Sequence, residues 1–140
     1  MNEVKFNNAD SVTIWSTGKP LRKFLYSDDL TQACVFLFEN VDYNDIAVED
    51  KSGTVQAHIN VGSDKEKSIR QLAEILQKVV GFINKLVFDA SKPDGTPGML
   101  IDSTRLQKLG WESKIELENG IDLAYKNFSN YSGYGESNSK

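Results

Sequence analysis

Hydrophobic residues along the chain follow two spacings, a short alternating one typical of strands and a spacing of three to four typical of helices. Runs rich in β-branched and aromatic residues predict four short strands, at residues 12–15, 23–26, 58–61 and 86–88. Apolar residues spaced by three and four predict four helices, near residues 28–41, 68–80, 104–109 and 117–128. This alternation predicts an α/β domain of α+β character, with a small mixed sheet and about four helices.

The helical segments carry their own end signals. Ser68 and Gln71 have the spacing of a capping box, and Gly81 follows the last apolar residue of the same helix. In the helix after Asp28, the apolar spacing includes Cys34, which we interpret as a small buried side chain and not a nucleophile. Residues 42–56 are acidic and aperiodic, so they predict a solvated surface loop.

Length and composition limit the class of protein. The chain has 140 residues, of which 39% are hydrophobic and 26% charged, as in ordinary globular domains. We therefore expect one domain over residues 1–129 and a flexible tail over 130–140, where no aliphatic residue occurs. No stretch is apolar enough to predict a membrane-spanning helix.

Charge and cysteine content bear on partners and location. The net charge is -4 and the 16 Lys and Arg residues are scattered, which argues against a nucleic-acid partner. A small anionic ligand needs only two or three local cations, so the net charge does not exclude a ligand of this kind. The single cysteine and the absence of a signal-peptide core at the N-terminus predict a cytoplasmic protein.

The scarcity of histidine excludes whole classes of site. His58 is the only histidine, so a Ser-His-Asp or Cys-His arrangement would have to use it, and its alternating surroundings indicate a structural residue on a strand. One histidine and one distant cysteine do not make a zinc site. We predict no catalytic and no metal-ligating residue in this chain.

Two loops that follow predicted strands are the strongest candidate binding site, because loops on a rigid scaffold are where ligands bind. Residues 15–22 offer the aromatic ring of Trp15 and the cations Lys19 and Arg22, and residues 91–98 offer Lys92 and Asp94. The guanidinium of Arg22 suits two-point contact with a phosphate. The alternative is that Trp15 belongs to the core and that Arg22 is a surface ion-pair partner.

At these residues the sequence resembles the GDP-L-fucose synthases, which are extended short-chain dehydrogenase/reductases. Residues 12–30, Val-Thr-Ile-Trp-Ser-Thr-Gly-Lys-Pro-Leu-Arg-Lys-Phe-Leu-Tyr-Ser-Asp-Asp-Leu, are similar to the C-terminal, substrate-binding portion of that family. Residues 58–73 resemble many nucleotide-sugar epimerases and dehydratases, whereas residues 88–97 and 102–111 are more particular to the fucose synthases. The resemblance extends over nearly the whole chain up to Phe128.

The resemblance implies a function and a site. The family converts GDP-4-keto-6-deoxy-D-mannose to GDP-L-fucose by epimerisation at C3 and C5 and by hydride transfer from NADPH to C4. Trp15, Arg22 and Asp94 match the family's substrate-binding Trp, Arg and Asp. A GDP-sugar is therefore the implied ligand, and NADP is the cofactor of the intact family.

Other family features are missing from this sequence. The only G-x-G is Gly133-Tyr134-Gly135 in the polar tail, and no tyrosine has a lysine four residues later. We therefore assign no cofactor-binding residue and expect the chain by itself to be inactive. Gly98-Met99 also stands where the family usually has an Arg-Lys pair, which removes two cations expected near the phosphates.

Three interpretations remain open. The chain is the substrate-binding portion of a fucose synthase-like enzyme, as a fragment, a truncated gene or half of a split protein. Alternatively it is a non-catalytic module that binds a nucleotide sugar or a protein partner, or a degenerate fragment that binds nothing. In the first case we expect it to associate with a Rossmann half or with itself.

Overall fold

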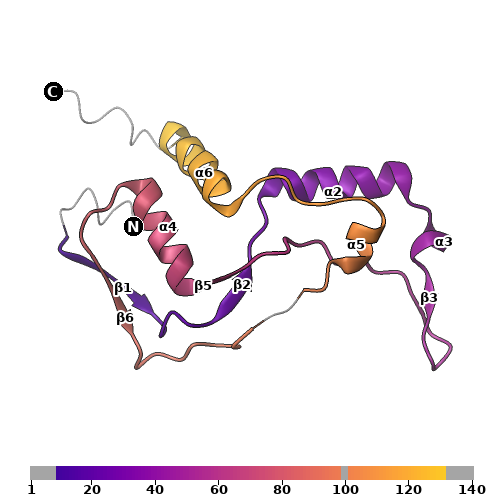
Figure 1. The fold of residues 1–140 in the computed structure, drawn as a ribbon, viewed down its shortest axis with the longest axis horizontal. Coiled ribbons are helices and arrows are strands. Elements are labelled where there is room, and N and C mark those ends of the chain that lie inside the picture. Colours follow the sequence, from indigo (N-terminus) through magenta and orange to yellow (C-terminus); the bar gives the residue numbers. More distant parts are fainter. Residues whose placement is uncertain (1–8, 99–100, 132–140) are drawn as a thin grey trace. The chain divides into compact units, whose positions relative to one another are not determined.

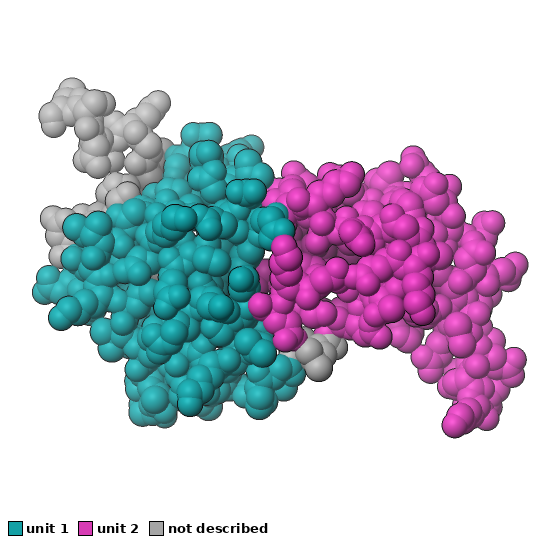
Figure 2. Space-filling view, in the orientation of Figure 1, with its two compact units in different colours: residues 1–22, 67–99, 116–140 teal, residues 23–66, 100–115 magenta. Residues whose placement is uncertain are grey.

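The computed structural model describes residues 9–98 and 101–131 and divides the chain into two compact units. Unit 1 comprises residues 1–22, 67–99 and 116–140, and unit 2 comprises residues 23–66 and 100–115 (Figure 2). Each unit is therefore assembled from segments that are far apart in the sequence. The domain boundary expected at residue 129 stays a prediction, although the last helix continues to Tyr131.

Unit 1 contains a parallel pair of strands, β1 (Ser11–Trp15) and β6 (Lys85–Asp89). Ser11 pairs with Lys85 at one end and Trp15 with Asp89 at the other, so both strands end at the same edge. These strands confirm two of the four predicted ones. Val12, Ile14, Leu86 and Phe88 are half-buried, whereas the alternate residues are exposed apart from Asp89, so one face of the pair is covered.

Helix α4 (Ile69–Val80) lies beside this strand pair (Figure 1). Its N-terminus is the predicted capping box, in which the Ser68 side chain accepts from the Gln71 N–H and the Gln71 side chain accepts from the Ser68 N–H. Gly81 ends the helix with a left-handed φ of 69°, as predicted. The amphipathic pattern is confirmed because Ala73 and Val80 are buried and Ile69, Leu72, Leu76 and Val79 are half-buried.

The last helix of unit 1, α6 (Leu117–Tyr131), packs against α4. An exposed salt bridge of 2.6 Å joins Lys78 of α4 to Glu118 of α6. Exposed ion pairs of this kind contribute about 0–1 kcal/mol, so apolar contacts carry most of the packing. Leu117, Ile121 and Tyr125 are half-buried as predicted, but Ala124 and Phe128 are exposed.

Unit 2 is built around helices α2 (Ser27–Asn40) and α5 (Thr104–Lys108). Its core consists of Ala33, Leu106 and Trp111, with Leu25, Phe36, Leu37, Ile59 and Val61 packed against them. A further single-turn helix, α3 (Tyr43–Ile46), leads into an antiparallel hairpin of β3 (Val48–Glu49) and β4 (Val55–Gln56). The α5 helix ends at Gly110 as predicted.

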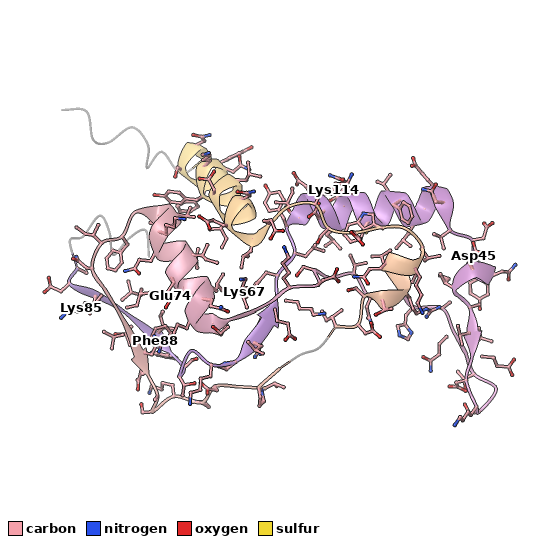
Figure 3. The ribbon with its side chains drawn as sticks, viewed as in Figure 1. Asp45, Lys67, Glu74, Lys85, Phe88 and Lys114 are labelled. Carbon is pink, nitrogen blue, oxygen red and sulfur yellow. The ribbon has the colours of Figure 1, made fainter. Side chains whose placement is uncertain are left out.

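A buried carboxyl group anchors α2 within unit 2. Asp29 is 1% exposed, and its Oδ2 atom accepts hydrogen bonds from the main-chain N–H groups of Lys114 (3.1 Å) and Ile115 (2.8 Å). Lys114 is labelled near α2 in Figure 3. These bonds satisfy two donors of a segment that has no regular secondary structure, so Asp29 fixes that segment to the first turn of the helix.

Several local predictions are wrong. The second strand, β2 (Leu21–Lys23), lies two residues earlier than predicted and pairs with β5 (Glu66–Ser68), which was not predicted. Residues 58–61 form no strand; Ile59 and Val61 pack on the unit 2 core instead, and His58 is exposed. Residues 42–56 contain α3 and the hairpin and are not an irregular loop.

The burial predicted for the helix after Asp28 is wrong at two positions. Cys34 is exposed, as is Leu30, whereas Ala33 is fully buried and Leu37 is half-buried. The buried stripe of α2 is therefore narrower than the apolar spacing indicates. The α/β class is confirmed, but the described residues form five helices and three two-stranded sheets in place of four helices and one mixed sheet.

Candidate functional site

The candidate site lies at one edge of unit 1, where both strands of its parallel pair end. Residues 16–20 follow β1 and residues 90–98 follow β6. Because neighbouring parallel strands end at the same edge of a sheet, their following loops begin side by side. The Ser16 N–H donates to the Asp89 carbonyl at 3.3 Å, which continues the strand pairing into the first loop.

The two loops meet again at their far ends. The Leu21 N–H donates to the carbonyl of Pro97 at 3.0 Å, and Leu21 forms an isolated parallel bridge with Gly98. The first loop is also held by α4, because its Gly18 and Pro20 carbonyls accept from the Arg70 and Ile69 N–H groups at 2.9 and 3.0 Å. These bonds satisfy donors at the helix N-terminus that have no partner within the helix.

Between these points, Asp94 joins the loops through its side chain. Its Oδ1 atom accepts from the Thr17 N–H and its Oδ2 atom accepts from the Thr17 hydroxyl, both at 2.6 Å. These bonds lower the pKa of Asp94 from its ordinary value of 3.8, with smaller contributions from the Ser16 hydroxyl and the positive charge of Lys19. The carboxylate is therefore ionised at neutral pH and holds Thr17 by two donors.

Trp15 is not a core residue. Its side chain is 72% exposed, and the Lys92 ammonium lies 5.3 Å from the centre of its ring, within cation–π range. Trp15 ends β1 and Lys92 belongs to the loop after β6, so this contact also joins the two loops. The indole is thus available to a ligand as a flat apolar surface.

Arg22 stands next to the second loop. It is half-buried, its Nη1 atom donates to the Leu21 carbonyl at 2.6 Å, and its Nη2 atom lies 3.9 Å from where a Cβ atom on Gly95 would be. Among the residues that the structure describes, no carboxylate forms a salt bridge with Arg22. The ion-pair alternative therefore finds no support, and most of the guanidinium donors are open to an anion.

A second arginine, Arg70, contacts both β6 and the first loop. The Arg70 guanidinium lies 3.9 Å from the centre of the Phe88 ring; Phe88 is labelled in Figure 3. The Arg70 Nη2 atom is 3.5 Å from the Thr17 carbonyl. Sequence reasoning missed Arg70, Ser16 and Thr17, although the Ser-Thr-Gly run of residues 16–18 is itself a turn signal.

Replacing Gly18 by alanine is expected to lower the free energy of unfolding by about 2 kcal/mol or more. Gly18 has a φ of 81°, and an added Cβ atom would lie 2.8 Å from the Phe88 ring and 3.1 Å from the Arg70 Cβ atom. Chemical denaturation would measure the loss. The matched change Gly53→Ala, with φ 82° but its nearest atom at 3.6 Å, should cost less, and equal losses would contradict the packing argument.

The described residues do not fit a bound dinucleotide. A dinucleotide site needs a glycine-rich turn that leads from a strand into a helix N-terminus. Here the turn after β1 leads into strand β2, and α4 begins at Ser68 after β5. Over residues 9–98 and 101–131 there is also no group of three or more side chains that could hold a metal ion.

Comparison with known proteins finds a family match for part of the chain. Residues 3–62, which are 60 of the 140 residues, match the NAD dependent epimerase/dehydratase family. The match includes β1, the first loop, Trp15 and Arg22, whereas Asp94 lies beyond it.

Relatives extend the likeness to nearly the whole chain and confirm the resemblance to the fucose synthases. The putative GDP-L-fucose synthase 2 of Arabidopsis thaliana is 48% identical over 125 residues, which are 89% of this chain and 34% of that protein. The GDP-L-fucose synthase of Escherichia coli K12 is 42% identical over 127 residues, 91% of this chain and 39% of that protein. The chain thus spans about a third of the length of these relatives.

A solved structure is similar in fold. The GDP-6-OMe-4-keto-L-xylo-heptose reductase of Campylobacter jejuni is 38% identical and has a TM-score of 0.79, over 87% of this chain and 34% of that one. The fold seen here is therefore similar to that of part of this reductase. None of the helices in the described part of the chain is long and apolar enough to cross a membrane.

Proposed function

We propose that this chain forms the GDP-sugar-binding part of a GDP-L-fucose synthase-like, NADP-dependent epimerase/reductase. The observation that carries the proposal is that Trp15 and Arg22 flank the first loop of unit 1 and that Asp94 lies on the second loop, which is hydrogen-bonded to the first. The names of the relatives each contain a GDP-sugar, which supports the same ligand class.

Each residue has a role that suits its chemistry. Arg22 binds the diphosphate, because a guanidinium makes charge-assisted hydrogen bonds that are about twice as strong as neutral ones. Trp15 provides a flat wall for the ligand, and Lys92 beside it adds positive charge to the same surface. Asp94 accepts a hydrogen bond from a hydroxyl or base N–H of the ligand with the lone pairs that Thr17 leaves free.

In this proposal, hydride transfer is carried out by a polypeptide segment other than these 140 residues. The sequence has neither the glycine-rich turn nor the Tyr and Lys pair of the family, and the described residues do not fit a dinucleotide. NADPH, which supplies the hydride in such enzymes and is released as NADP, would bind to a Rossmann segment that this chain meets as its partner. A cytoplasmic location, as the sequence predicts, suits such an enzyme.

Replacing Arg22 by alanine is expected to weaken GDP binding by at least about tenfold, because hydrogen bonds to charged groups contribute about 1.5–3 kcal/mol and tenfold equals about 1.4 kcal/mol. Isothermal titration calorimetry of the 140-residue chain with GDP and with GDP-fucose would measure the change. Lys51→Ala, which removes a positive charge from an exposed turn of unit 2, should leave the affinity unchanged.

Two outcomes of this titration would contradict the proposal in different ways. Unchanged affinity in Arg22→Ala would remove Arg22 from the site while leaving a binding module. No binding of GDP or GDP-fucose by the unaltered chain would contradict the proposed function itself and favour a chain that keeps the fold without the ligand.

A further inference from the structure

The carboxylate of Asp94 makes two short hydrogen bonds to one residue, Thr17, and the Ser16 hydroxyl is a weaker partner. The two residues are 77 positions apart, and each of the two bonds is 2.6 Å long. One bond involves the main chain of Thr17 and the other involves its hydroxyl, so together they fix both the position and the side-chain rotamer of Thr17. We call this pair of bonds the Thr17–Asp94 clasp.

Thr17 and Lys19 are the residues of the first loop for which no bond between main-chain groups is described, and the clasp holds Thr17, whose hydroxyl also accepts from the Lys19 N–H at 3.3 Å. Ser16 is bonded to Asp89, Gly18 and Pro20 are bonded to the α4 N-terminus, and Leu21 is bonded to Pro97. Thr17 lies between Trp15 and Arg22, the two residues that we place against the ligand. The N–H of Gly18 also donates to the Ser16 hydroxyl at 2.7 Å, which makes the turn around Thr17 tight.

We propose that Thr17 is a positioning residue of the GDP-sugar site, and that Asp94 acts on the ligand largely through it. The clasp sets the separation and orientation of Trp15 and Arg22 before the ligand arrives, so less conformational entropy is lost on binding. This inference rests on the proposed function and deepens it, because it assigns a role to a residue outside the matched set.

The alternative is that Asp94 contributes only by direct contact with the ligand. In that case the Thr17 hydroxyl is a bystander, and its removal leaves the affinity unchanged. A double-mutant cycle separates the two, because effects that pass through the same contact do not add, whereas independent effects do.

The test is GDP titration of the chain with Thr17→Val, Thr17→Ser, Asp94→Ala and the double variant Thr17→Val with Asp94→Ala. We expect Thr17→Val, which removes only the hydroxyl, to weaken binding about tenfold, and Thr17→Ser, which keeps both donors, to stay within twofold of the unaltered chain. In the Asp94→Ala background, Thr17→Val should cost less than twofold. Full affinity in Thr17→Val, or losses that multiply in the double variant, would overturn the proposal.

Amide hydrogen exchange of the chain without ligand provides a second readout. Exchange of the amides within residues 16–20, where Pro20 has none, should become at least tenfold faster in Asp94→Ala. Thr17→Ser should retain the slow exchange of the unaltered chain. The other main-chain bonds keep the loop attached, so the exchange of α4 should not change. Unchanged exchange in Asp94→Ala would overturn the clasp.

The two readouts also keep this proposal separate from the proposed function. If the unaltered chain does not bind GDP, the proposed function fails whatever the exchange data show. If the chain binds GDP and the exchange of residues 16–20 responds to Asp94 but Thr17→Val binds normally, the function stands and the positioning role of Thr17 fails.

Discussion

Replacing Asp29 by alanine is expected to lower the free energy of unfolding by about 3–5 kcal/mol, enough to unfold much of a domain of ordinary stability. The change removes the acceptor for the part-buried N–H groups of Lys114 and Ile115 and leaves both donors without this partner. It also leaves a cavity where a side chain only 1% exposed had been. Urea denaturation followed by circular dichroism would measure the loss.

Two variants serve as controls for this prediction. Asp29→Asn keeps an oxygen that can occupy the place of Oδ2, and the other carboxyl oxygen, Oδ1, has no hydrogen-bond partner to lose. Asp29→Asn should therefore lower the free energy of unfolding clearly less than Asp29→Ala does. Asp28→Ala removes an exposed carboxylate from the same helical turn and should cost about 0.5 kcal/mol through the helix dipole. An alanine at position 29 that costs no more than one at position 28 would contradict the anchoring role.

The largest functional effect is expected in an enzyme assay. The chain alone should not oxidise NADPH in the presence of GDP-4-keto-6-deoxy-D-mannose, because its sequence lacks the glycine-rich turn and the Tyr and Lys pair. Adding the N-terminal part of a GDP-L-fucose synthase as a separate polypeptide should restore NADPH oxidation, which absorbance at the nicotinamide band would follow.

Arg22→Ala is the matched control for this complementation. It should reduce the restored rate at subsaturating substrate by at least about tenfold. The reason is that losing a charged contact to the ligand raises the activation free energy measured from free enzyme and free substrate. NADPH oxidation by the chain alone would contradict the assignment of the redox chemistry to another segment. Binding of GDP without any restored turnover would favour the non-catalytic module.

Local signals predicted the helices well. The Ser68 and Gln71 capping box, the Gly81 end of α4 and the Gly110 end of α5 all occur as the sequence predicts. The bonds concerned join residues only a few positions apart, so their energetics are contained in a short stretch of sequence. The class of fold and the strands near residues 12–15 and 86–88 were also predicted, whereas the parallel pairing of these two strands was not.

Strands were predicted less well because a strand exists only with a neighbour. Residues 58–61 have the alternating, β-branched pattern of a strand, yet Ile59 and Val61 pack against Ala33 and Trp111 without forming a ladder. Conversely, β5 (Glu66–Ser68) is polar and has no pattern of its own, and it becomes a strand because β2 lies beside it. Pairing of this kind depends on distant residues.

The sequence by itself determined four of the five described helices, the family resemblance and the identity of the three candidate ligand-binding residues. Only the tertiary structure decided that Trp15 is exposed, that Arg22 has no carboxylate partner among the described residues, and that Thr17 holds both oxygens of Asp94. It also decided that Asp29 is buried although its neighbour Asp28 is exposed. The physical reason is that burial and hydrogen-bond partners are set by segments up to 86 positions away. The local sequence pattern around a residue does not indicate which distant segment will pack against it.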